Sequence, residues 1–346
     1  MVTGLVYDRA YLRHDTGEHV ESARRLALAL DYLKRGDVLK RLVPVRPRPD
    51  VLEEVAAVHG QAYVEKVREF SARGGGSFGS GNVGSRDTYD TALLAAGGVV
   101  AAVEAVLQGV VDNAFALVRP PGHHARPSLG MGFCFFNNVA VGARYAQKKY
   151  ALRKVLVVDW DEHHGNGTEK IFYEDRSVLF FSVHRDWSYP CTGMADRVGE
   201  GEGEGYNINV PLPRGAGDAD YELVFRRLLL PVALAYGPEL VLVSAGMDAH
   251  RSDPVGQMDV TAGGFAVMAS LVREIAVACC GGALVAALEG GYNPGALAEG
   301  VQAVLEVMSG RKTAHPNPKR RPVLNKTLET VEEVIKIHSR YWPVLA

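Results

Sequence analysis

Two aspartates, a glutamate and two histidines crowd one short segment, the stretch VVDWDEHHGNGT at residues 157–168. The segment closes an apolar, β-branched run, and Asp159, Asp161 and His163 stand at alternate positions. Residues two apart in an extended chain point the same way, so these side chains should line one face as the strand ends. Converging carboxylates and an imidazole favour a divalent metal such as zinc, whereas a single aspartate after a strand is most often a helix cap.

A metal at this point needs a further ligand from another segment, because catalytic zinc keeps three protein ligands and an open position. Asp248, in SAGMDAH at the end of another apolar run, is the best candidate. Two carboxylates with one imidazole form a hard site, so Fe²⁺ or Co²⁺ could also occupy it. Glu162 should point away from the metal and be solvated or cap a helix.

Three further residues could take part in proton transfer. His123 and His124, in RPPGHHARP, could be exposed polar residues, metal ligands or general acid and base catalysts. In the last case Asp159 would hold one imidazole by its ring N–H. Tyr292 follows two glycines in EGGYN, and these permit a tight turn that aims its phenol at a developing oxyanion, although an isolated tyrosine is usually a packing residue.

The elements that must position these residues alternate along the chain between short apolar runs and longer helical patterns, which predicts a mostly parallel sheet of about eight strands with helices on both faces. The expected strands are residues 4–8, 41–45, 114–120, 154–161, 177–184, 206–212, 240–246 and 283–290. The expected helices include residues 88–107, 138–147, 220–235, 261–279 and 295–308, the third kinked by Pro231. Residues 73–85, rich in glycine, are expected to be a flexible loop.

Polar clusters lie at or after the ends of four of the expected strands, and they contain His123, Asp159, Asp248 and Tyr292. Ligands bind at the carboxyl ends of the strands in open parallel sheets. The clusters therefore predict one pocket at one edge of one sheet. No linker long enough to divide domains occurs, so residues 1–346 are expected to form a single domain.

Composition excludes several other classes of function. The chain of 346 residues is 23% charged with a formal net charge of −2, which gives no electrostatic case for binding nucleic acid or anionic membrane. The basic cluster at residues 319–321 is short and is expected to be a solvated tail. Four cysteines match neither a zinc ribbon nor a disulfide framework, and the adjacent Cys279 and Cys280 are expected to be buried thiols. No leader pattern and no uninterrupted apolar run of about 18 residues appear, so a cytoplasmic location is expected.

Together the motifs RPPGHHA, GFCFFNN, VDWDEHHGNGT, SVH, SAGMDAHRSDPVGQM and LEGGYN make the sequence resemble the zinc-dependent histone deacetylase and acetylpolyamine amidohydrolase family. The motifs are most similar to those of class II-like deacetylases and microbial deacetylase-like amidohydrolases. The resemblance covers residues 14–309, with 310–346 as a C-terminal extension that ends in a helix. It implies the arginase-like α/β fold and the removal of acyl groups from N-acylated amines, with acetyl-lysine in proteins or peptides as the leading substrate.

The resemblance also assigns roles to individual residues. It implies the zinc ligands Asp161, His163 and Asp248, the tandem histidines His123 and His124, the supporting residues Asp159 and Asn166, and the carbonyl-polarising Tyr292. It implies substrate-tunnel walls at Gly132, Phe133 and Tyr189, and a structural K⁺ held by Asp159, Asp161, His163, Ser182 and Val183. It also places His14, His19 and Arg25 at the inner wall and Asp87 at the rim.

Two positions within the family pattern bear on activity and substrate. Asn166 stands behind His124 where some members have aspartate, and a neutral amide raises the pKa of an imidazole less than a carboxylate does. Val255 stands where polyamine-selective relatives carry an acidic residue, so nothing at this position attracts a polycation.

Competing interpretations remain open at this point. These are an acetylpolyamine or other small-amide deacetylase, an arginase-type hydrolase with two manganese ions, and an inactive acyl-amine-binding protein. Gly165, two residues after His163, argues against the two-manganese site, which needs further carboxylates. The sequence leaves open whether the chain is a monomer or a homodimer.

Overall fold

An eight-stranded parallel sheet forms the centre of the molecule in this computed structural model, which describes residues 1–311 and 321–346. Its strand order is β2-β1-β5-β10-β9-β6-β7-β8. The strands are β1 (Thr3–Val6), β2 (Val43–Val45), β5 (Asn113–Ala116), β6 (Val155–Asp159), β7 (Val178–Arg185), β8 (Asn207–Leu212), β9 (Leu240–Ala245) and β10 (Leu284–Leu288). They coincide with the eight apolar runs of the sequence, which confirms the predicted α/β fold.

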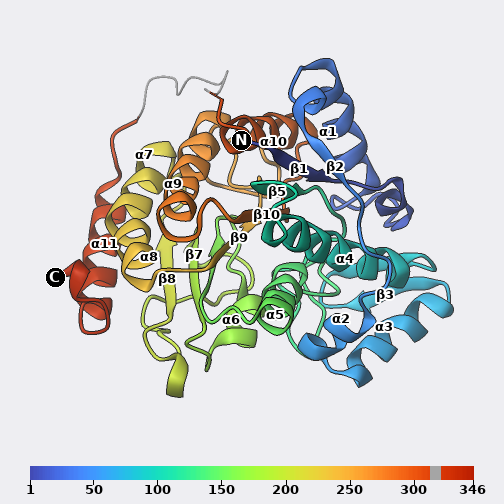
Figure 1. Ribbon diagram of the computed structural model, residues 1–346, viewed down its shortest axis with the longest axis horizontal. Helices are drawn as coiled ribbons and strands as arrows, with labels where there is room; N and C mark the ends of the chain where they lie inside the picture. The colour runs from blue at the N-terminus through green and yellow to red at the C-terminus, as the bar shows by residue number, and fades with distance from the viewer. Residues whose placement is uncertain (312–320) are drawn as a thin grey trace.

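Helices cover both faces of this sheet (Figure 1). One face carries α1 (Ala23–Arg35), α7 (Asp218–Val224), α8 (Leu230–Tyr236), α9 (Ala262–Cys280) and α10 (Pro294–Met308). The other carries α2 (Leu52–His59), α3 (Gln61–Ala72), α4 (Thr88–Leu107), α5 (Asn138–Tyr150) and α6 (Asn166–Phe172). Short 3-10 turns lie at Arg9–Arg13, Leu39–Arg41, Gly201–Gly203 and Pro343–Leu345.

Burial on both faces explains the near-continuous apolar composition of the central strands. Every residue of β6, β9 and β10 is buried, as expected where helices cover a parallel sheet on both sides. The helix expected at residues 220–235 is interrupted by a π-helical turn at Phe225–Leu229, directly before the segment whose first turn contains Pro231. Proline has no backbone N–H to donate to the preceding turn, which accounts for the break.

Two helices, α4 and α9, are long and apolar enough to cross a membrane by length and composition alone. Both lie inside the fold, with 72% and 56% of their most apolar windows buried. Core helices pass the same test, so these two are weak evidence for a membrane span. Their apolar character is explained by packing against the sheet and against neighbouring helices.

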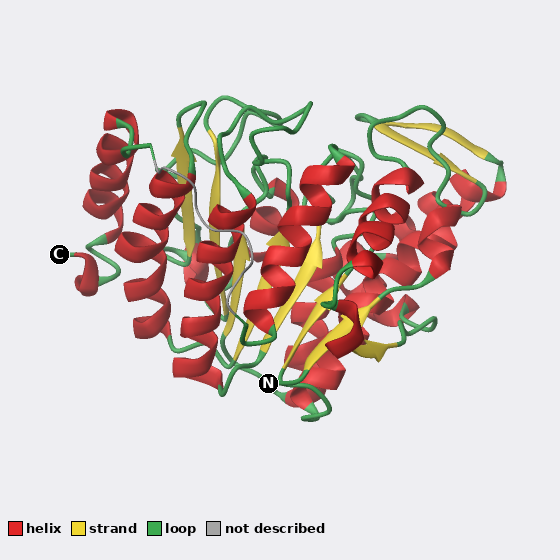
Figure 2. Ribbon diagram, turned by 90° about the horizontal axis from the view of Figure 1, so that it is seen from above, coloured by secondary structure: helices red, strands yellow, loops and turns green. Residues whose placement is uncertain are grey.

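The strand order brings the four polar clusters together. Strands β5, β10, β9 and β6 are consecutive neighbours at the middle of the sheet, although they are far apart in the chain. Parallel strands share the direction of their carboxyl ends, so the loops after these four strands meet at one edge. Figure 2 shows the loops gathered at that end of the molecule. The predicted single pocket therefore has a structural basis.

Four features differ from the sequence prediction or extend it. The glycine-rich segment is not a plain loop, because β3 (Gly75–Gly79) and β4 (Asn82–Ser85) form an antiparallel hairpin at the same end of the molecule as the pocket (Figure 2). The final helix, α11 (Asn325–His338), packs along edge strand β8. All four cysteines are free, but Cys279 and Cys280 are only half-buried. Of the basic cluster, residues 319 and 320 lie outside the described residues, and Arg321 pairs with Asp259 at 3.0 Å.

Candidate active site

Two carboxylates and an imidazole converge at the carboxyl ends of β6 and β9. The Nδ1 atom of His163 lies 3.1 Å from Oδ1 of Asp161 and 2.9 Å from Oδ2 of Asp248. All three residues are buried, and their ligand atoms lie within 4.8 Å of one another. Tetrahedral zinc with ligands at about 2 Å requires ligand atoms about 3.3 Å apart, so this group fits a zinc ion.

The electrostatics of the group also favour a cation. Burial, and then the neighbouring Asp161 carboxylate, raise the pKa of Asp248 to about 8. Two carboxylates this close and this deeply buried cannot both stay ionised unless a positive charge stands between them. Backbone groups fix the carboxylates, since Gly290 N–H donates to Asp161 at 2.8 Å and Glu162 N–H donates to Asp248 at 2.9 Å. Glycine at 290 is required, because a Cβ there would overlap both carboxylates.

His123, on the loop after β5, forms a buried pair with Asp159. The ring Nδ1 of His123 lies 3.0 Å from Oδ2 of Asp159, and both side chains are buried. Burial alone would lower the pKa of His123, but the Asp161 and Asp159 carboxylates outweigh it and raise the pKa to about 10. The pair thus favours a positively charged imidazole. A cation bound by Asp161 weakens one of these two contributions and leaves the Asp159 contact.

His124 stands in the opposite electrostatic setting. Its Nδ1 lies 2.8 Å from Oδ1 of Asn166, and burial, followed by repulsion from His123 and His163, holds its pKa well below the usual range. An amide oxygen can only accept, so Nδ1 of His124 carries the hydrogen and Nε2 keeps its lone pair free. The amide nitrogen of Asn166 faces Met131 Sδ at 3.4 Å, which is consistent with this orientation. His124 is therefore suited to accept a proton near neutral pH.

Tyr292 lies on the turn after β10 and faces the same space. Its backbone N–H donates to Asp253 at 2.6 Å, its ring makes an edge contact with Phe133 at 5.8 Å, and the guanidinium of Arg25 lies 4.9 Å from its ring centroid. Burial and the nearby Asp248 carboxylate raise the phenol pKa well above its usual value. The phenol thus keeps its proton and can donate a hydrogen bond.

These groups open onto one narrow cavity of about 270 Å³. Its lining consists of Ser80, Gly81, His124, Gly132, Phe133, His163, Tyr189, Val255 and Tyr292. The structure thus places the predicted tunnel walls Gly132, Phe133 and Tyr189, together with Val255, on the cavity that contains His124 and His163. The rings of His124 and Tyr189 meet edge to face at 5.1 Å. None of these lining side chains is acidic.

The residues predicted to hold K⁺ lie beside the metal group on β6 and β7. Asp159 and Ser182 are direct neighbours in the parallel ladder between these strands, and both are buried, as is Val183. The hydroxyl of Ser182 also lies 2.9 Å from His184 Nδ1. The sequence therefore selects residues that the fold brings together.

The structure also locates the other residues that the resemblance assigns to the pocket. Asp87 lies at the start of α4 beside a separate cavity shared with Arg13 and Asp90, not on the tunnel. Of the proposed inner-wall residues, Arg25 lies behind Tyr292, and His19 packs against Phe133 at 4.6 Å. His14 is buried against Thr88, at 2.8 Å.

The expectation that Glu162 is solvated or caps a helix is wrong. Glu162 is fully buried, pairs with Arg185 at 2.8 Å and accepts hydrogen bonds from the backbone N–H groups of Gln257 and Met258. The carboxylate therefore fixes the segment that follows Val255, which lines the tunnel.

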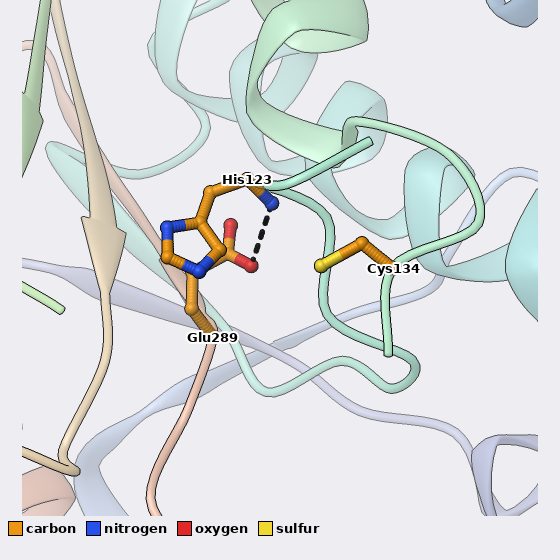
Figure 3. A group of neighbouring side chains, drawn as sticks. All are labelled: His123, Cys134 and Glu289. Carbon is orange, nitrogen blue, oxygen red and sulfur yellow. Dashed lines mark hydrogen bonds between the residues drawn. The ribbon is translucent and has the colours of Figure 1, made fainter. Parts of the chain in front are cut away.

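Figure 3 shows a second group of potential ligands, His123, Cys134 and Glu289. It adjoins the first group, because Nε2 of His123 lies 3.8 Å from Oδ1 of Asp161. Glu289 accepts hydrogen bonds from the backbone N–H groups of Gly122 and His123 at 2.6 and 3.1 Å. Burial raises the pKa of the Cys134 thiol well above its usual value, and a protonated thiol is a poor metal ligand. The role of Glu289 is therefore to hold the loop that carries His123. In the sequence, Glu289 is only one more carboxylate at a strand end.

Comparisons with known proteins agree with this geometry. The histone deacetylase domain family matches residues 19–308. A probable deacetylase of Archaeoglobus fulgidus is 39% identical over 357 residues and covers 99% of both chains. Histone deacetylase 15 of Arabidopsis thaliana and the human polyamine deacetylase HDAC10 are each 39% identical, but the present chain spans only 63% and 53% of their lengths. The crystal structure of an HDA15 HD domain superposes with a TM-score of 0.92 at 38% identity, over 99% of this chain and 96% of the other.

Proposed function

The chain belongs to the histone deacetylase family and is a hydrolytic deacetylase, and from this premise we propose that it removes acetyl groups from acetyl-lysine in proteins or peptides. The observation that carries the proposal is the meeting of a buried metal-binding group, a neutral histidine and a protonated tyrosine on one narrow, uncharged cavity. Acylated small amines, including acetylpolyamines, form the second candidate substrate class, since one relative is named a polyamine deacetylase.

We propose that Asp161, His163 and Asp248 hold zinc, on which the family generally depends, with Fe²⁺ or Co²⁺ as possible substitutes. Zinc held there supplies a Lewis acid that polarises the substrate carbonyl and lowers the pKa of a water molecule. With only three protein ligands, a zinc ion held there would remain accessible to substrate and water. Asp159, Asp161, His163, Ser182 and Val183 are proposed to hold a structural K⁺ beside the zinc site.

The contrast between the two tandem histidines supports a division of roles. His124, whose pKa is held low, accepts the proton of the attacking water through its free Nε2. As an imidazolium with a low pKa, it then readily donates that proton to the departing amine. His123, paired with Asp159, stays positively charged and favours the negative charge that develops on the carbonyl oxygen.

Tyr292 supplies the second source of stabilisation for that oxygen. Its raised pKa keeps the phenol protonated, and its place on the cavity wall lets it donate a hydrogen bond to the developing oxyanion. Arg25 behind the ring donates to the backbone carbonyl oxygens of Glu289 and Gly291, at 2.6 Å each, and so fixes the turn that carries Tyr292.

The walls of the cavity favour a lysine side chain over a polyamine. Phe133 and Tyr189 present aromatic surface that suits the apolar methylenes of a lysine stem. A polyamine carries additional positive charges, which lose hydration without a compensating carboxylate among the lining residues. Val255 provides only apolar surface at the position where an acidic residue would offer that compensation.

The test is a comparison of kcat/KM for an acetyl-lysine peptide, an acetylated polyamine and a longer acyl-lysine peptide, with the zinc-loaded protein. We expect kcat/KM to be highest for the acetyl-lysine peptide. Preference for the polyamine would support the second candidate, and hydrolysis of none would favour an inactive acyl-amine-binding protein.

A cytoplasmic location is also proposed, because all four cysteines are free thiols.

A further inference from the structure

Phe133, which forms the aromatic wall of the tunnel, has an unfavourable backbone conformation. Gly132 and Phe133 both have positive φ, at 55° and 70°. Glycine adopts this region freely, whereas a bulky residue such as phenylalanine rarely does, so other contacts must hold Phe133 there. The loop also packs tightly, because a Cβ at Gly132 would overlap the ring of the proposed base, His124. The position of this wall is thus coupled to the reacting groups.

The hairpin formed by β3 and β4 supplies those contacts. The side chain of Asn82, the first residue of β4, is fully buried. Its Oδ1 accepts a hydrogen bond from Phe133 N–H at 2.7 Å, and its Nδ2 donates to the carbonyl oxygen of Cys134 at 2.7 Å. Directly before the strand, the carbonyl oxygen of Ser80 accepts from Gly132 N–H at 3.1 Å. Three consecutive residues of the wall loop are therefore tied to this hairpin.

The chemistry of Asn82 is specific to an amide. One end must accept from the N–H of Phe133, and the other must donate to the carbonyl oxygen of Cys134. Alanine would leave a buried N–H and a buried C=O without partners. The turn that precedes Asn82 also lines the cavity through Ser80 and Gly81, so Asn82 connects two lining segments of the tunnel.

We propose that Asn82 is a positioning residue that sets how tightly the tunnel grips the alkyl stem of the substrate. The inference rests on the proposed deacetylase function, and it adds the hairpin to the substrate site. Asn82 does not touch the reacting atoms. Its loss should therefore weaken binding along the tunnel more than it changes the chemical step.

Two zinc-binding probes distinguish a specific loss of affinity along the tunnel from a general disruption of the active site. Acetohydroxamic acid reaches the metal and barely contacts the wall, whereas octanohydroxamic acid fills the tunnel with a seven-carbon chain. For Asn82→Ala we expect the Kd of octanohydroxamic acid to rise about tenfold, with that of acetohydroxamic acid within about twofold of the wild-type value. In turnover of an acetyl-lysine peptide, KM should rise about tenfold with little change in kcat. Asn82→Asp, which keeps the acceptor for Phe133 N–H, should give an intermediate result.

Asn113→Ala is the matched control. Asn113 is equally buried and its Nδ2 donates to the carbonyl oxygen of Met308 at 3.0 Å, but it lies at the amino end of β5, away from the tunnel. This variant should leave the ratio of the two Kd values unchanged. If Asn82→Ala does not fold, the same ratio is measured for Asn82→Asp, where a shift of at least about threefold is expected. An unchanged ratio of the two Kd values, including an equal loss of affinity for both probes, would overturn the proposed role.

Hydrogen exchange distinguishes failure of this inference from failure of the proposed function. In the metal-free protein, the amides of residues 132–134 should exchange faster in Asn82→Ala than in the wild type. Unaltered exchange would contradict the proposal that Asn82 holds this loop in place. A wild-type protein that binds neither hydroxamate and hydrolyses no acyl-lysine would instead overturn the proposed function. The exchange result is independent of that outcome.

Discussion

The Nδ1 atom of His124 lies 2.8 Å from the side-chain oxygen of Asn166, while the neighbouring His123 lies 3.0 Å from the carboxylate of Asp159. Two adjacent imidazoles thus have partners of different charge. The carboxylate raises the pKa of His123, and burial without such a partner lowers that of His124. Pairs of titratable groups whose pKa values are pushed apart are typical of acid–base catalysis.

Asn166→Asp should move the pH dependence of the reaction. A carboxylate at this position stabilises the imidazolium form of His124 and raises its pKa by about one unit or more. Because the proposed base acts in its neutral form, activity is lost as the pH falls below that pKa. The acidic limb of the kcat/KM profile should therefore shift to higher pH in the variant. A limb at the wild-type position would show that His124 is not the group that limits activity on the acid side.

Tyr292→Phe should lower kcat about 100-fold or more, since it removes one donor to the developing oxyanion. Metal content and the KM for an acetyl-lysine peptide should change little, because the ring and its contact with Phe133 remain. Tyr236→Phe is a suitable control, as its hydroxyl donates to the carbonyl oxygen of Arg176 at 3.2 Å, away from the tunnel. Near-normal turnover by the Tyr292 variant would refute its proposed role.

Metal analysis should find one zinc ion per wild-type chain and much less in Asp248→Ala. The loss of zinc follows from removing one of its three protein ligands. Asp218→Ala is the control variant. Asp218 is also buried and accepts from Thr261 Oγ1 at 2.7 Å, but it is not part of the metal group. Two manganese ions per chain would favour an arginase-type site, and full metal content in Asp248→Ala would mean that the third ligand has been misassigned.

The sequence predicts the sheet and the metal group well, because both depend on local patterns. Near-continuous apolar runs locate the eight strands, and the rule that ligands bind at the carboxyl ends of parallel strands brings Asp161 and Asp248 together despite their separation in the chain. The alternation of side chains along a strand accounts for the shared direction of Asp161 and His163.

The features that the sequence does not reveal depend on distant partners. Glu162 is buried because its carboxylate accepts a hydrogen bond from the backbone N–H of Gln257, 95 residues later in the chain. The hairpin at β3 and β4 has few apolar side chains, and its buried anchor, Asn82, finds its partners 51 and 52 residues away. No periodicity in either segment records such contacts, so composition alone suggests solvated or flexible chain.

Glu21→Gln should destabilise the fold by about 3 kcal/mol at neutral pH, since it leaves the fully buried Arg119 without its carboxylate partner, 2.6 Å away. Burial opposes ionisation of Glu21, but Arg119 and Arg25 outweigh it and lower the pKa to about 2. The stabilisation by the ionised group is therefore complete above the unfolded pKa of about 4.5 and is lost as the pH falls toward 2.

Urea unfolding of the wild type and the Glu21 variant, measured from pH 7 downward, tests this pH window. The free-energy difference between the two proteins should shrink below about pH 4.5. Glu332→Gln, which breaks an exposed pair with Arg227, should cost less than about 1 kcal/mol. A difference for Glu21→Gln that does not depend on pH would mean that the ionised pair is not the source of the stabilisation.

Val255→Glu should shift substrate preference toward polyamines. Val255 is half-buried on the tunnel wall, where a carboxylate would face the amines of a polycation that the native lining leaves without a counter-charge. We expect the ratio of kcat/KM for an acetylated polyamine to that for an acetyl-lysine peptide to rise about tenfold or more, and the gain to shrink as salt screens the new charge. Val255→Gln, of similar size without charge, is the control. An equal gain in the glutamine variant would attribute the effect to shape, and no gain in either would place substrate selection elsewhere on the rim.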